Sequence, residues 1–193
     1  MTEKTESILS HDEILKTLTE AKPLLFDKGC HENSLAALVE KAIEITHSDL
    51  AAYYQINRIS VRKTNLCLIY KKFRRPLPEI LPGEGELVSF ILDCRETVLK
   101  LSSNEDSDEK LFSEILLHPS MKSGVAIPII SETAEGVSYV TGILYVNSKT
   151  NNFYNRSRFL LLENLSKLAM GFIKRCDNED SPKNVPLKEG VVV

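Results

Sequence analysis

Two long apolar segments toward the end of the chain, SGVAIPII and VSYVTGILYV, most constrain what it can fold into. Both are rich in residues that favour strands, and a turn at Glu135 and Gly136 separates them. Strands this apolar are typical of the centre of a sheet that is covered on both faces. Pro128 lacks the N–H that a central strand uses, so we expect it at a bulge or a poorly paired position.

Apolar periodicity elsewhere in the chain predicts further helices and strands. The spacing predicts helices over 10–22, from Asn33 onward, after Gly85, near 111–116 and over 155–175. LAAYYQI, LCLIYKKF and TVLKL have the composition of strands, and the first two are expected to be neighbours in a hairpin or meander. The last helix is apolar around so much of its surface that it can pack on two partners.

Length and charge limit the interpretation further. A chain of 193 residues has the size of one domain, and we expect a flexible N-terminus over 1–9, one domain over 10–176 and a polar tail over 177–193. A net charge of −3 gives no general attraction to nucleic acid or anionic lipid. The N-terminus lacks the pattern of a signal peptide, and no apolar run has the length of a membrane span. We therefore expect a cytoplasmic protein without nucleic-acid or membrane partners.

Neither the cysteines nor the histidines have the spacing of a metal or catalytic site. Cys30, Cys67, Cys94 and Cys176 are scattered without a C-x-x-C pair, and we expect them to be buried thiols. The histidines are isolated from one another and from acidic clusters at helical spacing. We therefore predict no catalytic residues, no metal and no cofactor.

One local excess of positive charge occurs in this acidic chain. It consists of Arg58, Arg62, Lys63, Lys71, Lys72, Arg74 and Arg75. Such a group can bind phosphate, although basic runs at strand ends more often keep a sheet edge soluble. An anion-binding patch is therefore one of two interpretations of this segment.

Several motifs are similar to those of GAF domains. GEGELVSFILDCRETVLKL resembles the family's glycine-led helix and the strand that follows it, and SGVAIPI resembles its Pro-containing strand. TGILYVNSKTNNFYNRSRFLLLENLSKLAMGFI resembles its last strand, Phe-containing loop and closing helix. The resemblance covers residues 35–173.

This resemblance implies an α+β, PAS-related fold with an antiparallel sheet of about six strands, terminal helices on one face, and short helices and loops that roof a pocket on the other. It also implies a homodimer through the terminal helices. Strand alternation then predicts that the pocket is lined by Tyr54, Gly124, Ala126, Ile143, Tyr145 and Asn147, under a roof that includes Phe90 and Cys94. The same residues could instead close an ordinary core.

The chain departs from two ligand-binding classes of the family. The acidic pair of the cyclic-nucleotide class is replaced here by Ser157 and Arg158. The Cys-His dipeptide of the bilin-binding class occurs only at Cys30 and His31, which precede the second helix and would not face the pocket. We therefore expect neither a cyclic nucleotide nor a bilin.

The chain also departs from the free methionine sulfoxide reductases of the family. Leu87 stands where one of their cysteines should follow the Gly-x-Gly, the loop 117–124 has none, and Cys94 lacks a resolving partner. We therefore predict a non-catalytic regulatory or sensory domain that binds an unidentified small-molecule effector and acts in signal transduction as a homodimer. Two alternatives stay open: a ligandless domain that dimerises or docks a protein partner, and a thiol-dependent reductase.

Overall fold

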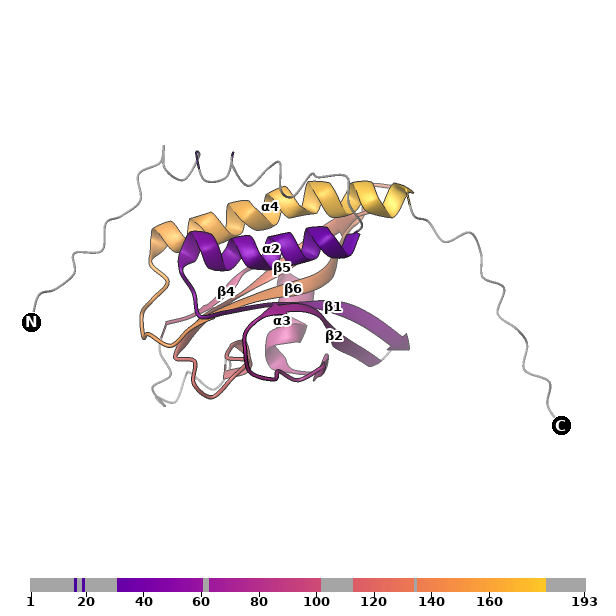
Figure 1. The fold of residues 1–193 in the computed structure, drawn as a ribbon. Helices are drawn as coiled ribbons and strands as arrows, with labels where there is room; N and C mark the ends of the chain where they lie inside the picture. The colour runs from indigo at the N-terminus through magenta and orange to yellow at the C-terminus, as the bar shows by residue number, and fades with distance from the viewer. Residues whose placement is uncertain are drawn as a thin grey trace, which may run out of the picture.

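A computed structural model describes residues 31–60, 63–101, 113–133 and 135–179, together with Lys16 and Thr19. In these ranges six strands form one antiparallel sheet, in the order β3-β2-β1-β6-β5-β4. Helices cover both faces of the sheet (Figure 1), which is the predicted α+β arrangement. The predicted N-terminus 1–9, residues 180–193 of the predicted tail 177–193, and the predicted helix 10–22 apart from Lys16 and Thr19 lie outside the described residues.

The two apolar segments form neighbouring interior strands of the sheet, as predicted from their apolar character. They are β5 (Ser123–Glu132) and β6 (Ser138–Ser148), and both are buried along most of their length. The short edge strand β4 (Val98–Lys100) pairs with β5 only at residues 124–126, so Pro128 lies beyond it, and a register shift follows Ile129. The prediction that Pro128 occupies a poorly paired position is therefore confirmed.

The other half of the sheet is the predicted hairpin. β1 (Leu50–Ser60) pairs with β6 on one side and with β2 (Lys63–Lys72) on the other. The short strand β3 (Ile80–Pro82) pairs with β2 and forms the second edge. The Pro-rich segment between β2 and β3 therefore turns at one end of the hairpin.

Two helices lie side by side on one face of the sheet (Figure 1). They are α2 (His31–Thr46) and α4 (Arg156–Glu179). α4 continues beyond the predicted boundary of the domain at residue 176, because 176–179 contains no Gly or Pro and Pro182 is the first helix breaker. No helix in the part of the chain that the structure describes is long and apolar enough to span a membrane.

The sheet separates two apolar cores, because successive side chains of a strand point to opposite faces. The core beneath α2 and α4 contains Leu38, Ala42, Tyr53, Val125, Leu144, Val146, Leu161 and Leu165. The core on the other face contains Leu50, Ala52, Tyr54, Leu66, Leu87, Ile91, Ile115, Met121, Ala126, Ile143 and Tyr145. The second core includes most of the residues predicted to line a pocket.

The third helix, α3 (Glu86–Cys94), covers the second core. Gly85 provides no side-chain cap, and the carboxylate of Glu114 instead accepts the N–H of Leu87 at 3.3 Å, which satisfies one free donor at the helix start. A Cβ on Gly85 would lie 2.5 Å from Glu114 Oε2, so the glycine permits this approach. Of the helix predicted near 111–116, the structure describes a single 3₁₀ turn at 113–115, and residues 111–112 lie outside the described ranges.

Candidate functional site

The six strand residues predicted to line a pocket come together on the face of the sheet beneath α3. Tyr54, Ala126, Ile143, Tyr145 and Asn147 are each at most 1% exposed. Gly124 lies among them, and a Cβ there would collide with the carboxamide of Asn147 and with the side chain of Ile115. The strand alternation read from the sequence therefore places these residues on one face, where they are closely packed.

The two tyrosines of this group make their contacts within the chain. Their rings meet edge to face, with centroids 5.6 Å apart, and Tyr54 donates its hydroxyl to the carbonyl oxygen of Pro78 at 2.7 Å. Burial raises the pKa of Tyr54 to about 12. Burial also raises the pKa of Tyr145, and the negative charge of Glu114 and the nearby Tyr54 raise it further. Both phenols are therefore neutral at physiological pH.

Asn147 uses its carboxamide to hold the roof onto the sheet. Its Nδ2 donates to the carbonyl oxygen of Ile115 at 2.9 Å, and its Oδ1 accepts the backbone N–H of Leu117 at 3.0 Å. Two of the three polar side chains expected to contact a ligand, Tyr54 and Asn147, thus bond to the chain's own backbone.

The structure corrects the expected positions of Phe90 and Cys94. α3 packs on the sheet through Leu87, Val88 and Ile91, so the buried stripe is rotated from the predicted one, and Phe90 is 39% exposed. Cys94 is also exposed, which contradicts the expectation of a buried thiol. These two residues therefore lie outside the packed space that they were expected to roof.

Of the other three cysteines, Cys67 is the one whose side chain the structure describes. Cys67 lies on β2 and is half-buried. Cys30 lies outside the described ranges, and the side chain of Cys176 is not among those described. The expectation of buried thiols is therefore tested only at Cys67 and Cys94, and Cys94 contradicts it.

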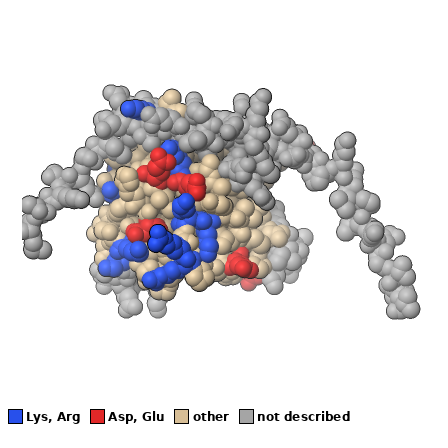
Figure 2. Space-filling view, viewed as in Figure 1, with Lys and Arg blue, Asp and Glu red and all other residues tan. Residues whose placement is uncertain are grey.

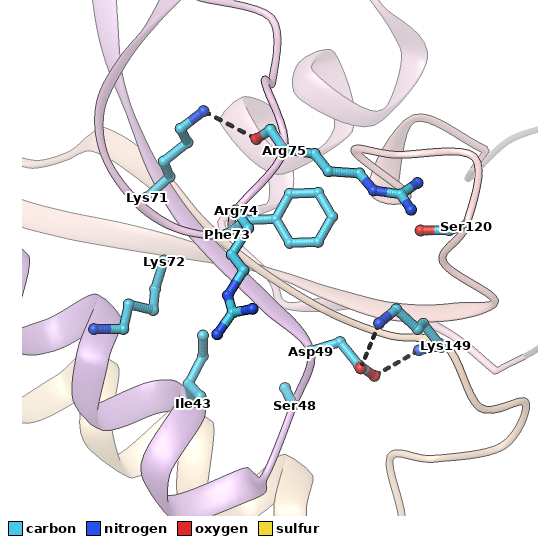
Figure 3. Close-up of a pocket in the computed structure, with 10 residues that line it drawn as sticks. All are labelled: Ile43, Ser48, Asp49, Lys71, Lys72, Phe73, Arg74, Arg75, Ser120 and Lys149. Atoms are coloured by element: carbon cyan, nitrogen blue, oxygen red, sulfur yellow. Dashed lines mark hydrogen bonds and ion pairs between the residues drawn. The ribbon is translucent and has the colours of Figure 1, made fainter.

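A concave site opens elsewhere, where β2 ends beside the connection between α2 and β1 (Figure 3). We call it the basic pocket. Its volume is about 630 Å³, and its lining residues are Ile43, Ser48, Asp49, Lys71, Lys72, Phe73, Arg74, Arg75, Ser120 and Lys149. Four of the seven cations predicted as an anion patch are in this set.

The predicted patch is split by the geometry of the hairpin. The backbones of Arg58 and Lys63 lie at the turn between β1 and β2, whereas Lys71 and Lys72 lie at the other end of β2. Lys71 follows Lys63 by eight residues of extended strand, which places their backbones about 26 Å apart. Arg62 and the side chains of Arg58 and Lys63 lie outside the described residues. The single patch of seven residues is therefore corrected to a smaller group at one end of the hairpin.

Asp49 is the one acidic residue in the lining, and Lys149 pairs with it. Lys149 Nζ lies 3.2 Å from the carboxylate, and the backbone N–H of Lys149 donates to it at 2.9 Å. Burial by itself raises the pKa of Asp49, but Lys149 and the hydroxyl of Ser148 outweigh that effect and lower the pKa overall. The carboxylate of Asp49 is therefore ionised at neutral pH, and the positive charge of Lys149 balances it.

Lys71 and Lys72 also have partners within the chain. Lys72 forms an ion pair of 2.9 Å with Glu40 of α2, and Lys71 donates to the carbonyl oxygen of Arg75 at 3.1 Å. The hydrogen bond from Lys72 lowers the pKa of Glu40, despite partial desolvation. No ion pair to Arg74 or Arg75 is formed by the residues that the structure describes. Lys71 has no ion pair among these residues either, so Lys71 and the two guanidinium groups carry the uncompensated charge of the pocket.

Besides the apolar Ile43 and Phe73, sequence reasoning missed four polar residues of this site: Ser48, Asp49, Ser120 and Lys149. They come from three segments that are far apart in the chain, and no spacing pattern links them to the basic run at 71–75. The basic run was the one signal available from the sequence.

The fold defines a class: the chain has the six-stranded antiparallel sheet and helix arrangement of GAF domains. The solved GAF domain of an Acinetobacter phosphoenolpyruvate-protein phosphotransferase has a similar structure, with a TM-score of 0.66 and 18% identity over 92% of this chain and 100% of that one. No family model matches the chain, and no curated protein matches it by sequence.

Enzymes share this fold as well. A free methionine-R-sulfoxide reductase from Neisseria meningitidis matches with a TM-score of 0.67 and 15% identity, over 87% of this chain and 92% of that one. A reductase of the same type from Staphylococcus aureus matches with a TM-score of 0.64 and 14% identity, over 83% and 94%. The prediction that the chain is not an enzyme is corrected accordingly: its fold is equally close to that of enzymes, and its enzymatic status is open.

Proposed function

We propose that this chain is a GAF-like regulatory domain that acts through its surfaces, by self-association and by docking a protein partner. The observation that carries this proposal is the filled space between the sheet and α3. Tyr54, Tyr145 and Asn147, which were predicted to line an effector pocket, are each at most 1% exposed, and the two rings contact each other. Admitting a ligand there would break the hydrogen bonds of Asn147 to 115–117.

The paired terminal helices support self-association. α2 and α4 lie together on one face of the sheet, away from α3 (Figure 1). Leu160 on α4 is 38% exposed, whereas Leu161, Leu162, Leu165 and Ala169 of that helix are buried in the core beneath it. A second copy that covered Leu160 would bury more apolar surface, which favours association by about 25 cal/mol for each Å².

The test is the mass of the full chain in solution, measured by light scattering and sedimentation across a concentration series. We expect a dimer that Leu160→Glu converts to a monomer. Ile80→Glu is the matched control, because Ile80 is 58% exposed on the edge strand β3 and should leave the dimer intact. A wild-type monomer at every concentration would contradict the proposal.

A thermal-shift screen of metabolites tests the observation that carries the proposal, the close packing beneath α3. We expect no saturable stabilisation that depends on the space beneath α3. Tyr145→Phe keeps the ring and removes its hydroxyl, so a metabolite whose effect is lost in this variant would assign an effector to that space and overturn the proposal.

A thiol-dependent reductase is the second candidate, and the exposed thiol of Cys94 favours it, because a catalytic thiol must be accessible. Reduction of free methionine-R-sulfoxide by the full chain tests it. Activity that is lost in Cys94→Ser and retained in Cys67→Ser would establish the reductase. Absence of activity in the wild-type chain would exclude it.

A further inference from the structure

We propose that the basic pocket binds the phosphoryl group of a small soluble molecule. This site goes beyond the proposed function, because it lies outside the filled space beneath α3 and needs neither a dimer nor a protein partner. Its location is the junction of the β2 end, the α2–β1 connection, the loop at Ser120 and the end of β6 (Figure 3).

The charge of the pocket suits an anion. Five cationic side chains line it, namely Lys71, Lys72, Arg74, Arg75 and Lys149, against the one carboxylate of Asp49. That carboxylate is already paired with Lys149, and Lys72 is paired with Glu40. The positive charge that has no acidic partner among the described residues is therefore on Lys71, Arg74 and Arg75. Basic side chains gather on this face of the molecule with a few acidic ones beside them (Figure 2).

The donor types suit phosphate in particular. A guanidinium presents a planar set of N–H groups that matches two oxygens of a phosphoryl group. Arg74 extends toward the α2–β1 connection and Arg75 toward Ser120 (Figure 3). The lining also includes Ser48 and Ser120, whose hydroxyls are additional polar groups at the site. Phe73, which is half-buried, offers an apolar surface to the organic part of a ligand.

The segment that carries the arginines is held in place before any ligand binds. Lys71 bonds across its turn to the carbonyl of Arg75, and the ring of Phe73 packs against His118 with centroids 5.2 Å apart. Immediately beyond, Leu77 is buried in the second core, and Pro78 accepts the hydroxyl of Tyr54. A backbone anchored on both sides of Arg74 and Arg75 lowers the ordering cost of binding.

Shape and net charge select a small ligand over a polyanion. A concave volume of about 630 Å³ lies within the range of small-molecule sites. A membrane or a nucleic acid would have to approach a chain whose net charge is −3. The pocket therefore fits a phosphomonoester better than an extended phosphate surface.

Calorimetry on the full chain, with phenyl phosphate as the probe, tests this proposal. We expect saturable binding that the double variant Arg74→Gln, Arg75→Gln weakens by at least about tenfold, since two charge-assisted contacts are lost. Binding should strengthen between pH 5 and pH 7, because the second ionisation of a phosphomonoester has a pKa of about 6. Benzenesulfonate, which has the same ring and one charge, should bind more weakly.

The control removes the same charge elsewhere. Arg95→Gln, Arg156→Gln changes two exposed arginines outside the basic pocket and should keep the wild-type affinity. Equal weakening in both double variants, or no saturable binding of phenyl phosphate to the wild-type chain, would overturn the proposal. Cosedimentation with phosphatidic acid vesicles distinguishes the phosphoryl group of a soluble molecule from that of a lipid headgroup. Binding to the vesicles without binding to phenyl phosphate would overturn the proposal of a soluble ligand. Melting curves of both variants establish that they are folded.

Discussion

The buried carboxamide of Asn147 donates a hydrogen bond to the carbonyl oxygen of Ile115, 2.9 Å away. The same side chain accepts the N–H of Leu117, so one residue of the last central strand fastens the turn at 113–117 to the sheet. Its side chain is 0% exposed, so these two bonds satisfy a carboxamide that is buried in the fold. This contact explains why a residue suited to bind a ligand serves instead to close the fold.

Asn147→Ala should therefore destabilise the domain strongly. The substitution leaves a buried carbonyl and a part-buried N–H without partners, which costs about 2–4 kcal/mol in the free energy of unfolding. Chemical denaturation measures the loss. Asn151→Ala, at an exposed asparagine, should stay within about 0.5 kcal/mol of wild type. A similarly small effect of Asn147→Ala would show that the turn is not held by this side chain.

Tyr54 and Tyr145, whose rings meet edge to face, should respond differently to loss of the hydroxyl. Tyr54→Phe removes the hydrogen bond to Pro78 and should cost about 1 kcal/mol. The hydroxyl of Tyr145 has no hydrogen-bond partner among the residues that the structure describes, so Tyr145→Phe should be neutral or slightly stabilising. Denaturation of both variants at pH 7 compares them, and equal losses would contradict the assigned hydrogen bonds.

Alkaline pH should destabilise the domain through its buried phenols. Burial raises the pKa of Tyr54 to about 12, and it also raises the pKa values of Tyr145 and Tyr154 above the ordinary value. Stability is fully present below the unfolded pKa of about 10 and falls as pH rises above it, by about 1.4 kcal/mol per pH unit for each such tyrosine.

The double variant Tyr54→Phe, Tyr145→Phe should lose less stability than the wild-type chain between pH 10 and pH 11. Tyr139→Phe, at a tyrosine that is 37% exposed, should keep the wild-type pH dependence and serves as the control. Denaturation midpoints across this range measure the difference. Identical slopes for the double variant and the wild-type chain would contradict the burial of these two phenols.

Acidic pH should remove the contribution of Asp49. Lys149 and Ser148 outweigh the effect of burial and lower the pKa of this carboxyl, so its stabilisation is present above the unfolded pKa of about 4 and is lost as pH falls through the lower folded pKa. Asp49→Asn should cost about 0.5–1 kcal/mol at pH 7, since the ion pair is partly exposed. The difference from wild type should vanish near pH 2, and a constant difference would contradict the ion pair.

Much of the fold could be predicted because apolar periodicity is a local property of the chain. The alternation in β5 and β6 fixes which side chains share a face, and Tyr145 and Asn147 lie on the same face as Tyr54 for that reason. The rotation of α3 could not be predicted, because its contact with Glu114 and the packing of Val88 depend on residues far away in sequence. Phe90 and Cys94 were misplaced as a result.

The sequence by itself determined the central strands, the faces to which their side chains point, and the basic run at 71–75. Only the tertiary structure decided that the space beneath α3 is filled, because packing depends on how side chains from separate elements meet. It also decided which cations act together: the hairpin holds Lys63 apart from Lys71, and the folded chain brings Lys149 and Ser120 beside Arg74 and Arg75. Electrostatic interaction depends on distance in space, which separation along the sequence does not fix.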